Sequence, residues 1–233
     1  EVRLRSAVFE LGVGRELIDW AEVRAGFRVG SGDTKLRVGD PSVIPFDSFH
    51  RGSVFARFSV DTLDSISFPR RGAFATFEWR GSSTGVLGAD QNFDQLLINA
   101  AYAKSWSRHT LLTRFRYDTT ISGEAPIFNL FGIGGFLDLS GLNTRQFTGE
   151  HATRLGASYY RQVGDLALFP AFVGMSVEVG NAWQSRSDIS LNGSIWGGSI
   201  WAGVDTPVGP VVLAYGDAEG GHSAFYVSLG RLF

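Results

Sequence analysis

The sequence predicts an all-β chain that crosses a membrane as an antiparallel up-and-down β-barrel, and three observations predict this class. Apolar and polar residues alternate in stretches of about 10–13 residues, whereas strands of globular proteins usually have five or six. Aromatic residues lie near the ends of these stretches, as in the interfacial girdles of membrane barrels. The aromatic residues concerned are Trp20, Trp79, Trp106, Trp183 and Phe233.

The polar faces of the stretches carry many charges of both signs, and this is the third observation. A soluble barrel alternates in the same way, but with its apolar face inside and its charged face outside. Mixed arginines and carboxylates favour instead a wet lumen in which cross-strand ion pairs form. The residues predicted to face this lumen are Arg24, Arg57, Asp61, Glu78, Arg114, Arg116, Asp118, Arg154 and Glu178.

Eleven alternating stretches follow one another along the chain. They cover residues 2–11, 20–29, 52–63, 72–80, 95–106, 111–120, 153–163, 171–183, 195–205, 211–217 and 222–233. The connections alternate between a longer or more polar set (32–51, 81–90, 122–150, 184–193 and 217–222) and a shorter set (13–19, 64–71, 107–109, 164–169 and 206–210). Bacterial outer-membrane barrels have short turns in the periplasm and long loops outside. We therefore expect one barrel domain over 1–233 with a long extracellular loop at 122–150.

The last stretch is predicted to be the closing strand of the barrel. Its apolar face carries Phe225, Val227, Leu229 and Phe233, and its opposite face carries smaller or more polar residues. A closed single-chain barrel of this kind has an even number of strands. Three alternatives stay open for the odd count: residues 35–43 supply a twelfth strand, further strands precede Glu1, or another chain completes the barrel. The alternating connections favour strands before Glu1, and we also expect an upstream targeting segment and domain.

The composition argues against several other functions. A net charge of −2 does not favour nucleic-acid binding, which needs a clustered positive field. The four histidines are scattered without metal-ligand spacing, so we expect no metal and no cofactor. Gly81–Gly85 has the pattern G-x-S-x-G, but no helix follows it, so Ser83 is not expected to be a nucleophile. We expect no enzymatic activity in this chain.

Three motifs carry a resemblance to a known superfamily. They are the segment Gly132–Leu142 in the longest loop, the pattern Asp61-x-x-Asp64-x-x-x-Phe68-Pro69-x-x-Gly72 between two strands, and the ending Asp205–Tyr215 followed by the last strand. Together they resemble the superfamily of BamA and the two-partner-secretion transporters (bacterial surface antigen), and most of all the C-terminal barrel of type V secreted patatin-like phospholipases. The resemblance implies a sixteen-stranded barrel of which these are the last eleven strands.

The resemblance also implies a site. The loop motif falls on Gly134, Gly135, Leu139, Ser140, Gly141 and Leu142. In BamA-like members an arginine at the position of Ser140 reaches an inward acidic residue on a later strand, which matches Glu178. Since the arginine is missing here, our hypothesis is that Arg145, Arg154 or Arg114 pairs with Glu178, among lumen charges that include Arg116 and Asp118. The alternative is that Glu178 is one of several solvated lumen carboxylates.

The function implied by the resemblance is that of a bacterial outer-membrane barrel that anchors, and also translocates, an upstream patatin-like lipase domain. A passive pore or an assembly factor that inserts other barrels is one alternative, although the missing arginine weighs against insertion. A structural barrel that closes by homodimerisation is another. The partners expected are outer-membrane lipid and lipopolysaccharide, the barrel assembly machinery and a second copy of the chain.

Overall fold

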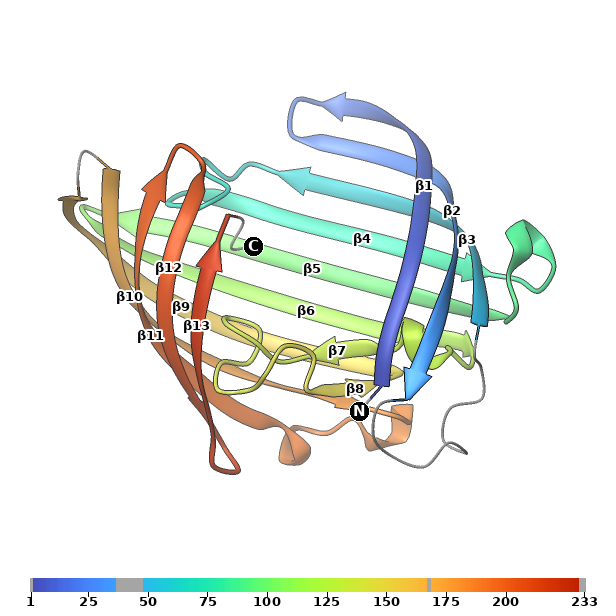
Figure 1. Cartoon of the computed structure of the whole chain (residues 1–233). Coiled ribbons are helices and arrows are strands. Elements are labelled where there is room, and N and C mark those ends of the chain that lie inside the picture. The colour runs from blue at the N-terminus through green and yellow to red at the C-terminus, as the bar shows by residue number, and fades with distance from the viewer. Residues whose placement is uncertain (1, 37–47, 167–168, 231–233) are drawn as a thin grey trace. The chain divides into compact units, whose positions relative to one another are not determined.

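The computed structural model describes residues 2–36, 48–166 and 169–230, in which eleven strands form one antiparallel sheet (Figure 1). The sheet strands are β1 (Val2–Ile18), β2 (Ala21–Leu36), β3 (Ser48–Asp61), β4 (Gly72–Ser82), β5 (Phe93–Trp106), β6 (His109–Gly123), β9 (His151–Leu166), β10 (Phe169–Trp183), β11 (Ile195–Thr206), β12 (Gly209–Ala218) and β13 (His222–Leu229). They are hydrogen-bonded in chain order from β1 to β13. Two short strands, β7 (Phe131–Ile133) and β8 (Phe147–Gly149), form a separate pair.

The helices of the described residues are short 3₁₀ turns, and none of them is long and apolar enough to span a membrane. They are η2 (Val86–Gly88), η3 (Ile127–Asn129), η4 (Arg186–Asp188) and η5 (Leu191–Gly193).

The chain divides into two compact units. Unit 1 comprises residues 1–59, 77–97 and 119–130, and unit 2 comprises residues 60–76, 98–118 and 131–233. The long connection between β6 and β9 is therefore shared, since its first part belongs to unit 1 and its second part to unit 2. Each unit is described separately below.

The all-β class and the eleven sheet strands predicted from the sequence are confirmed. Most strands are longer than predicted, because alternation weakens towards strand ends while backbone pairing continues. Residues 13–18, predicted to lie in a turn, continue β1, which pairs with β2 as far as Ile18. The loop predicted at 122–150 contains β7 and β8. Of the candidate twelfth strand at 35–43, Lys35 and Leu36 end β2 and the remainder lies outside the described residues, as does Phe233.

The polarity of the two faces of the sheet is the reverse of that in a soluble β-barrel. Large apolar side chains are exposed along one face, from Val23 (42%), Phe77 (45%) and Tyr102 (53%) to Val177 (48%). Glu78, Arg114, Asp118, Arg154 and Glu178, all predicted to face the lumen, are at most 8% exposed. Since water would not favour an exposed apolar face of this extent, this polarity indicates that hydrocarbon is the solvent of the outward face.

An aromatic cluster fills one region of the polar face in unit 2. Phe68 stacks on Phe172, with ring centroids 4.3 Å apart, and lies 6.0 Å from the ring of Trp201. Tyr160 contacts the same three rings and donates its hydroxyl hydrogen bond to the Pro69 carbonyl. Phe68 and Pro69 come from the turn between β3 and β4, so the turn folds back onto the sheet.

This turn explains the spacing of the second sequence motif. Asp64 Oδ1 accepts hydrogen bonds from the backbone N–H groups of Arg70 (2.8 Å) and Arg71 (3.1 Å), which closes the turn behind Phe68. Gly72 has a φ of +104°, and a Cβ there would lie 2.0 Å from the Thr62 carbonyl oxygen. The motif therefore consists of a carboxylate that caps the turn, an aromatic anchor and a glycine that permits close backbone approach.

Introducing a charged residue on the outward face tests whether that face lies in hydrocarbon. Val177 lies near the middle of β10, and we expect Val177→Arg to lower the free energy of unfolding by about 2–4 kcal/mol, because arginine at the bilayer midplane must be desolvated. Urea titration of the protein folded in lipid vesicles measures this, with Val177→Leu as the control of similar size. Equal stability of the two variants would mean that this face lies in water.

Candidate functional site

Residues 131–149 form a segment that lies against the polar face of the sheet in unit 2 (Figure 1). Three of its aliphatic side chains are fully enclosed: Ile133 is 1% exposed, and Leu139 and Leu142 are 0% exposed. These three pack together with Ala218 of β12. The segment, named the docked segment below, is therefore part of the packed structure of the unit rather than a loop in solvent.

Asp138 ties the docked segment to two strands of the sheet. Its Oδ1 lies 3.1 Å from Nε of Arg154 on β9, and its Oδ2 lies 3.5 Å from Nη1 of Arg116 on β6. Oδ2 also accepts a hydrogen bond from the Gly134 N–H at 3.2 Å. Arg116 makes a second ion pair, at 2.5 Å, with Asp118 on its own strand. The carboxylate of Asp138 therefore joins the segment to β6 and β9 at one point.

Residues 140–142 are named the tip of the docked segment, and Ser140 joins this tip to β10. Its backbone N–H donates a hydrogen bond of 3.0 Å to Oε2 of Glu178, and the two residues are 0% and 1% exposed. The Ser140 hydroxyl accepts a hydrogen bond of 3.0 Å from the N–H of Leu137, which has a φ of +61°. Ser140 thus stabilises the turn with its side chain and contacts the buried carboxylate with its backbone.

The hypothesis of a direct arginine partner for Glu178 differs from this geometry. Within the described part of the chain Glu178 forms no ion pair, although its charge acts on Arg114 and Arg154. The side chain of Arg145 packs over Gly132 of β7, where its Cγ would be 2.6 Å from an added Cβ. The alternative of a solvated carboxylate does not fit a residue that is 1% exposed. A backbone donor takes the place of the expected arginine because the tip approaches β10 closely.

Three glycines allow this close approach. Gly141 has a φ of +106°, and a Cβ there would lie 2.4 Å from the backbone nitrogen of Ala218. On the sheet, a Cβ at Gly216 would lie 2.6 Å from the Gly141 nitrogen, and one at Gly197 would lie 2.5 Å from the Ser140 oxygen. A Cβ at any of these positions would collide with backbone, so the tip and the sheet can approach this closely only with glycine at all three.

Tyr226 extends the docking to β13. Its hydroxyl accepts a hydrogen bond from the Gly141 N–H (2.8 Å) and donates one to the Leu142 carbonyl (2.7 Å). The segment is thereby held by residues of β6, β9, β10, β12 and β13, and all of these residues belong to unit 2. The predicted outward face of β13 is also present, with Phe225, Val227 and Leu229 between 71% and 84% exposed.

The structure brings together most of the predicted site residues but adds two that the sequence did not single out. Gly134, Gly135, Leu139, Ser140, Gly141 and Leu142 all lie in the docked segment, and Arg154 and Arg116 reach it. Asp138 and Tyr226 were missed. Asp138 lies inside the quoted motif, so a carboxylate flanked by apolar residues in a loop was the available signal. Tyr226 is the one aromatic on the polar face of its strand.

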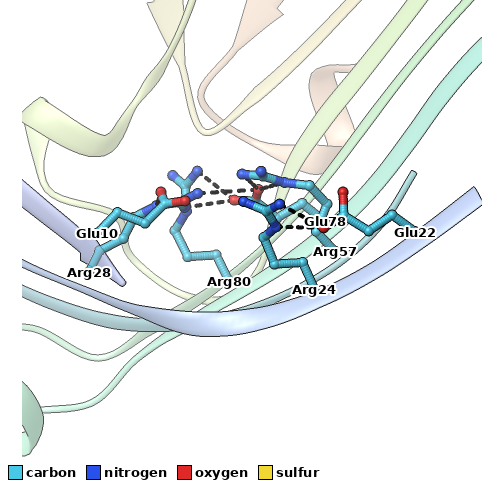
Figure 2. Close-up of polar contacts among 7 residues, drawn as sticks. All are labelled: Glu10, Glu22, Arg24, Arg28, Arg57, Glu78 and Arg80. Atoms are coloured by element: carbon cyan, nitrogen blue, oxygen red, sulfur yellow. Dashed lines mark hydrogen bonds and ion pairs between the residues drawn. The ribbon is translucent and has the colours of Figure 1, made fainter. Parts of the chain in front are cut away.

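Unit 1 contains a second buried charge cluster, which is shown in Figure 2. Glu78 on β4 accepts Arg28 Nη1 at 2.7 Å, Arg57 Nη2 at 2.5 Å and Arg80 Nη2 at 2.8 Å. Arg28 also pairs at 2.5 Å with Glu10 on β1. One carboxylate, whose side chain is 8% exposed, thus links guanidinium groups from β2, β3 and β4.

The contacts described for these two sites join parts of the structure to one another. Among the described residues, no group of three His, Cys, Asp or Glu side chains could hold a metal ion. The charges of each cluster are used in contacts between strands or between the sheet and the docked segment. The arrangement stabilises a polar interior behind an apolar exterior, which is what a membrane-spanning β-sheet requires.

Fold and site together define an outer-membrane β-barrel protein with a segment docked on its polar face. A family model described as the Omp85 superfamily domain matches residues 2–233, and the chain belongs to this superfamily. It is an outer-membrane protein like its relatives.

Two comparisons identify similar proteins. The chain is 28% identical to the "Outer membrane protein assembly factor BamA" of Nitratidesulfovibrio vulgaris, and the match covers 76% of this chain and 25% of the relative. The chain thus spans about a quarter of the length of this curated relative. The crystal structure of BamA from Haemophilus ducreyi lacking POTRA domains 1-3 has a TM-score of 0.75 at 12% identity, covering 98% of this chain and 53% of that chain. This likeness confirms the barrel fold.

Removing the glycine at the tip should undock the segment. We expect Gly141→Ala to lower stability through the cost of a positive φ, about 1–2 kcal/mol, and through a collision with β12 worth about a further 1–3 kcal/mol. Limited proteolysis should then cleave within residues 131–149. Gly221→Ala is the matched control, because Gly221 has a φ of +77° but no atom within 4 Å of an added Cβ. If both variants resisted protease equally, close packing would not hold the segment.

Neutralising Glu78 should destabilise unit 1. We expect Glu78→Gln to lower the free energy of unfolding by about 3–5 kcal/mol, since three guanidinium groups lose a shared, largely buried counter-charge. Denaturant unfolding in lipid vesicles measures the change. Glu22→Gln is the control within the same cluster, because Glu22 pairs with Arg24 at a more exposed position and should change stability by at most about 1 kcal/mol. Similar losses in the two variants would contradict the central role of Glu78.

Proposed function

We propose that this chain is the membrane domain of a protein that assembles other outer-membrane proteins. Two findings support the proposal: membership of the Omp85 superfamily, and sequence similarity to a protein named as an outer-membrane protein assembly factor. The observation that carries it is the docked segment, whose tip is hydrogen-bonded to Glu178 of β10 and to Tyr226 of β13. The barrel assembly machinery is then the cellular setting in which the chain acts.

The docked segment weighs against the alternative of a passive pore. Ser140, Gly141 and Leu142 are fixed on the sheet by hydrogen bonds to Glu178 and Tyr226. A polar face that is occupied by a folded segment offers less free path to ions than an empty one. We expect the protein in planar bilayers to show no steady conductance, and a stable open level would favour the pore.

A second candidate function is to anchor and translocate an attached domain, such as a patatin-like lipase. The observation that favours it is Ser140, which stands where the resemblance to BamA-like members leads one to expect an arginine. Its contact with Glu178 is a backbone hydrogen bond instead of an ion pair. Because the arginine of BamA-like members is absent, the resemblance supports insertion of other barrels less strongly and leaves anchoring and translocation open.

Depletion of the protein in its host separates the two functions. If it is an assembly factor, several unrelated outer-membrane proteins should lose their folded, heat-modifiable form on gels. Gly221→Ala should restore them in complementation and Gly141→Ala should not, since only the latter undocks the segment. If other outer-membrane proteins stay folded while only a domain attached to this chain loses its surface exposure to added protease, the anchoring function is correct.

A further inference from the structure

The outward face of β9–β13 carries an open groove, all of it within unit 2. Its volume is about 760 Å³, within the range of pockets that hold small molecules. Its walls are mostly apolar and face away from the docked segment. The outward side chains that form them include Val173, Met175, Ile200, Leu213, Phe225 and Val227.

The groove exists because one small residue interrupts a row of large ones. Strand pairing places Arg161, Val173, Ala202, Leu213 and Val227 side by side across five strands. In this row Ala202 lies between Val173 and Leu213, and it has no side chain to fill the space between them. A linear apolar ligand can therefore lie over Ala202 along the outward face.

Arg161 gives one end of the groove a positive charge. Its side chain is exposed on the outward face, and within the described residues its guanidinium has no hydrogen bond and no ion pair. A cation beside a membrane-facing apolar surface is costly unless it meets an anion or reaches the interface. The residues that line the groove include no carboxylate, so an anion that meets Arg161 within the groove would belong to a bound ligand.

The height of Arg161 on the sheet matches the membrane interface. The backbone N–H of its neighbour Gln162 donates a 3.0 Å hydrogen bond to the carbonyl of Arg108, in the tight turn between β5 and β6. Arg161 thus lies level with the end of a hairpin on the short-turn side. Tyr159, two residues earlier, contacts the rings of Trp106 and His109, as aromatic residues do at the level of lipid head groups.

We propose that this groove binds a glycerophospholipid of the surrounding membrane, with its phosphate on Arg161 and an acyl chain over Ala202. Guanidinium is the side chain best suited to bind phosphate, because its donors match two phosphate oxygens. Tyr159 borders the phosphate position and the apolar walls take the chain. The inference is independent of whether the protein assembles barrels or anchors a passenger.

A second copy of the chain is a less suitable occupant. A copy that packed groove against groove would bring a second Arg161 and the same lining, which includes no carboxylate. A lipid supplies both the acyl chain and the anion in one molecule. Charge complementarity therefore selects the lipid.

Native mass spectrometry of the intact protein in detergent, titrated with dioleoylphosphatidylglycerol, tests the site. We expect Arg161→Gln to weaken lipid binding about tenfold, the typical value of a hydrogen bond to a charged group. Ala202→Phe should weaken it similarly by filling the groove while Arg161 is retained. Arg186→Gln, the same change in the exposed connection between β10 and β11, should bind as the wild type does.

Two further ligands identify what the site recognises. Dioleoylglycerol has the same chains without phosphate and should bind no better to the wild type than to Arg161→Gln. Inorganic phosphate should not displace the lipid, because it lacks the chain that fills the groove. Unchanged phosphatidylglycerol binding in both Arg161→Gln and Ala202→Phe would overturn the proposal. So would a dimer that persists after delipidation and excludes added lipid.

Discussion

The constraint on which the rest of this structure depends is that one face of the sheet meets hydrocarbon, so charges in the middle of the strands must be satisfied on the other face. An outward charge such as that of Arg161 lies near the level of a turn instead. Successive side chains of a strand point to opposite faces of the sheet, so a charged side chain on the outward face would be exposed to lipid. Buried charges are tolerated only when they are paired and hydrogen-bonded. The polar face is consequently a network of contacts.

The two units satisfy this constraint in different ways. In unit 1 the partners come from neighbouring strands, where Glu78 gathers Arg28, Arg57 and Arg80. In unit 2 an inserted segment brings the partners, since Asp138 meets Arg116 and Arg154. The long connection after β6 therefore adds the counter-charge of Asp138 and enclosed apolar side chains to those that the strands of unit 2 supply, such as Asp118, which pairs with Arg116.

Much of this architecture could be predicted from the sequence, because period-two alternation is a local property. The eleven strands follow from alternation, and strand length, the aromatic residues at strand ends and the mixed charges of the polar face then assign Val177 outward and Glu78 inward. What could not be predicted is which inward groups meet. The partner of Glu178 is a backbone N–H, which has no sequence signal, and the fit of Gly141 to Gly216 depends on two segments far apart in the chain. Ion pairs from Asp138 to two strands likewise depend on a fold-back that no local pattern encodes.

The replacement of an expected arginine by Ser140 changes how the docking energy is distributed. A guanidinium in the polar interior would concentrate the attraction in one ion pair with Glu178, at a large desolvation cost for both charges. Here a hydrogen bond to the carboxylate contributes about 1.5–3 kcal/mol, and desolvation falls on the carboxylate alone. The remaining stabilisation must come from the ion pairs of Asp138, the hydroxyl of Tyr226 and the enclosed side chains of Leu139 and Leu142. Because these contacts belong to one short segment, the loss of one should weaken the others, and their energies will not add independently.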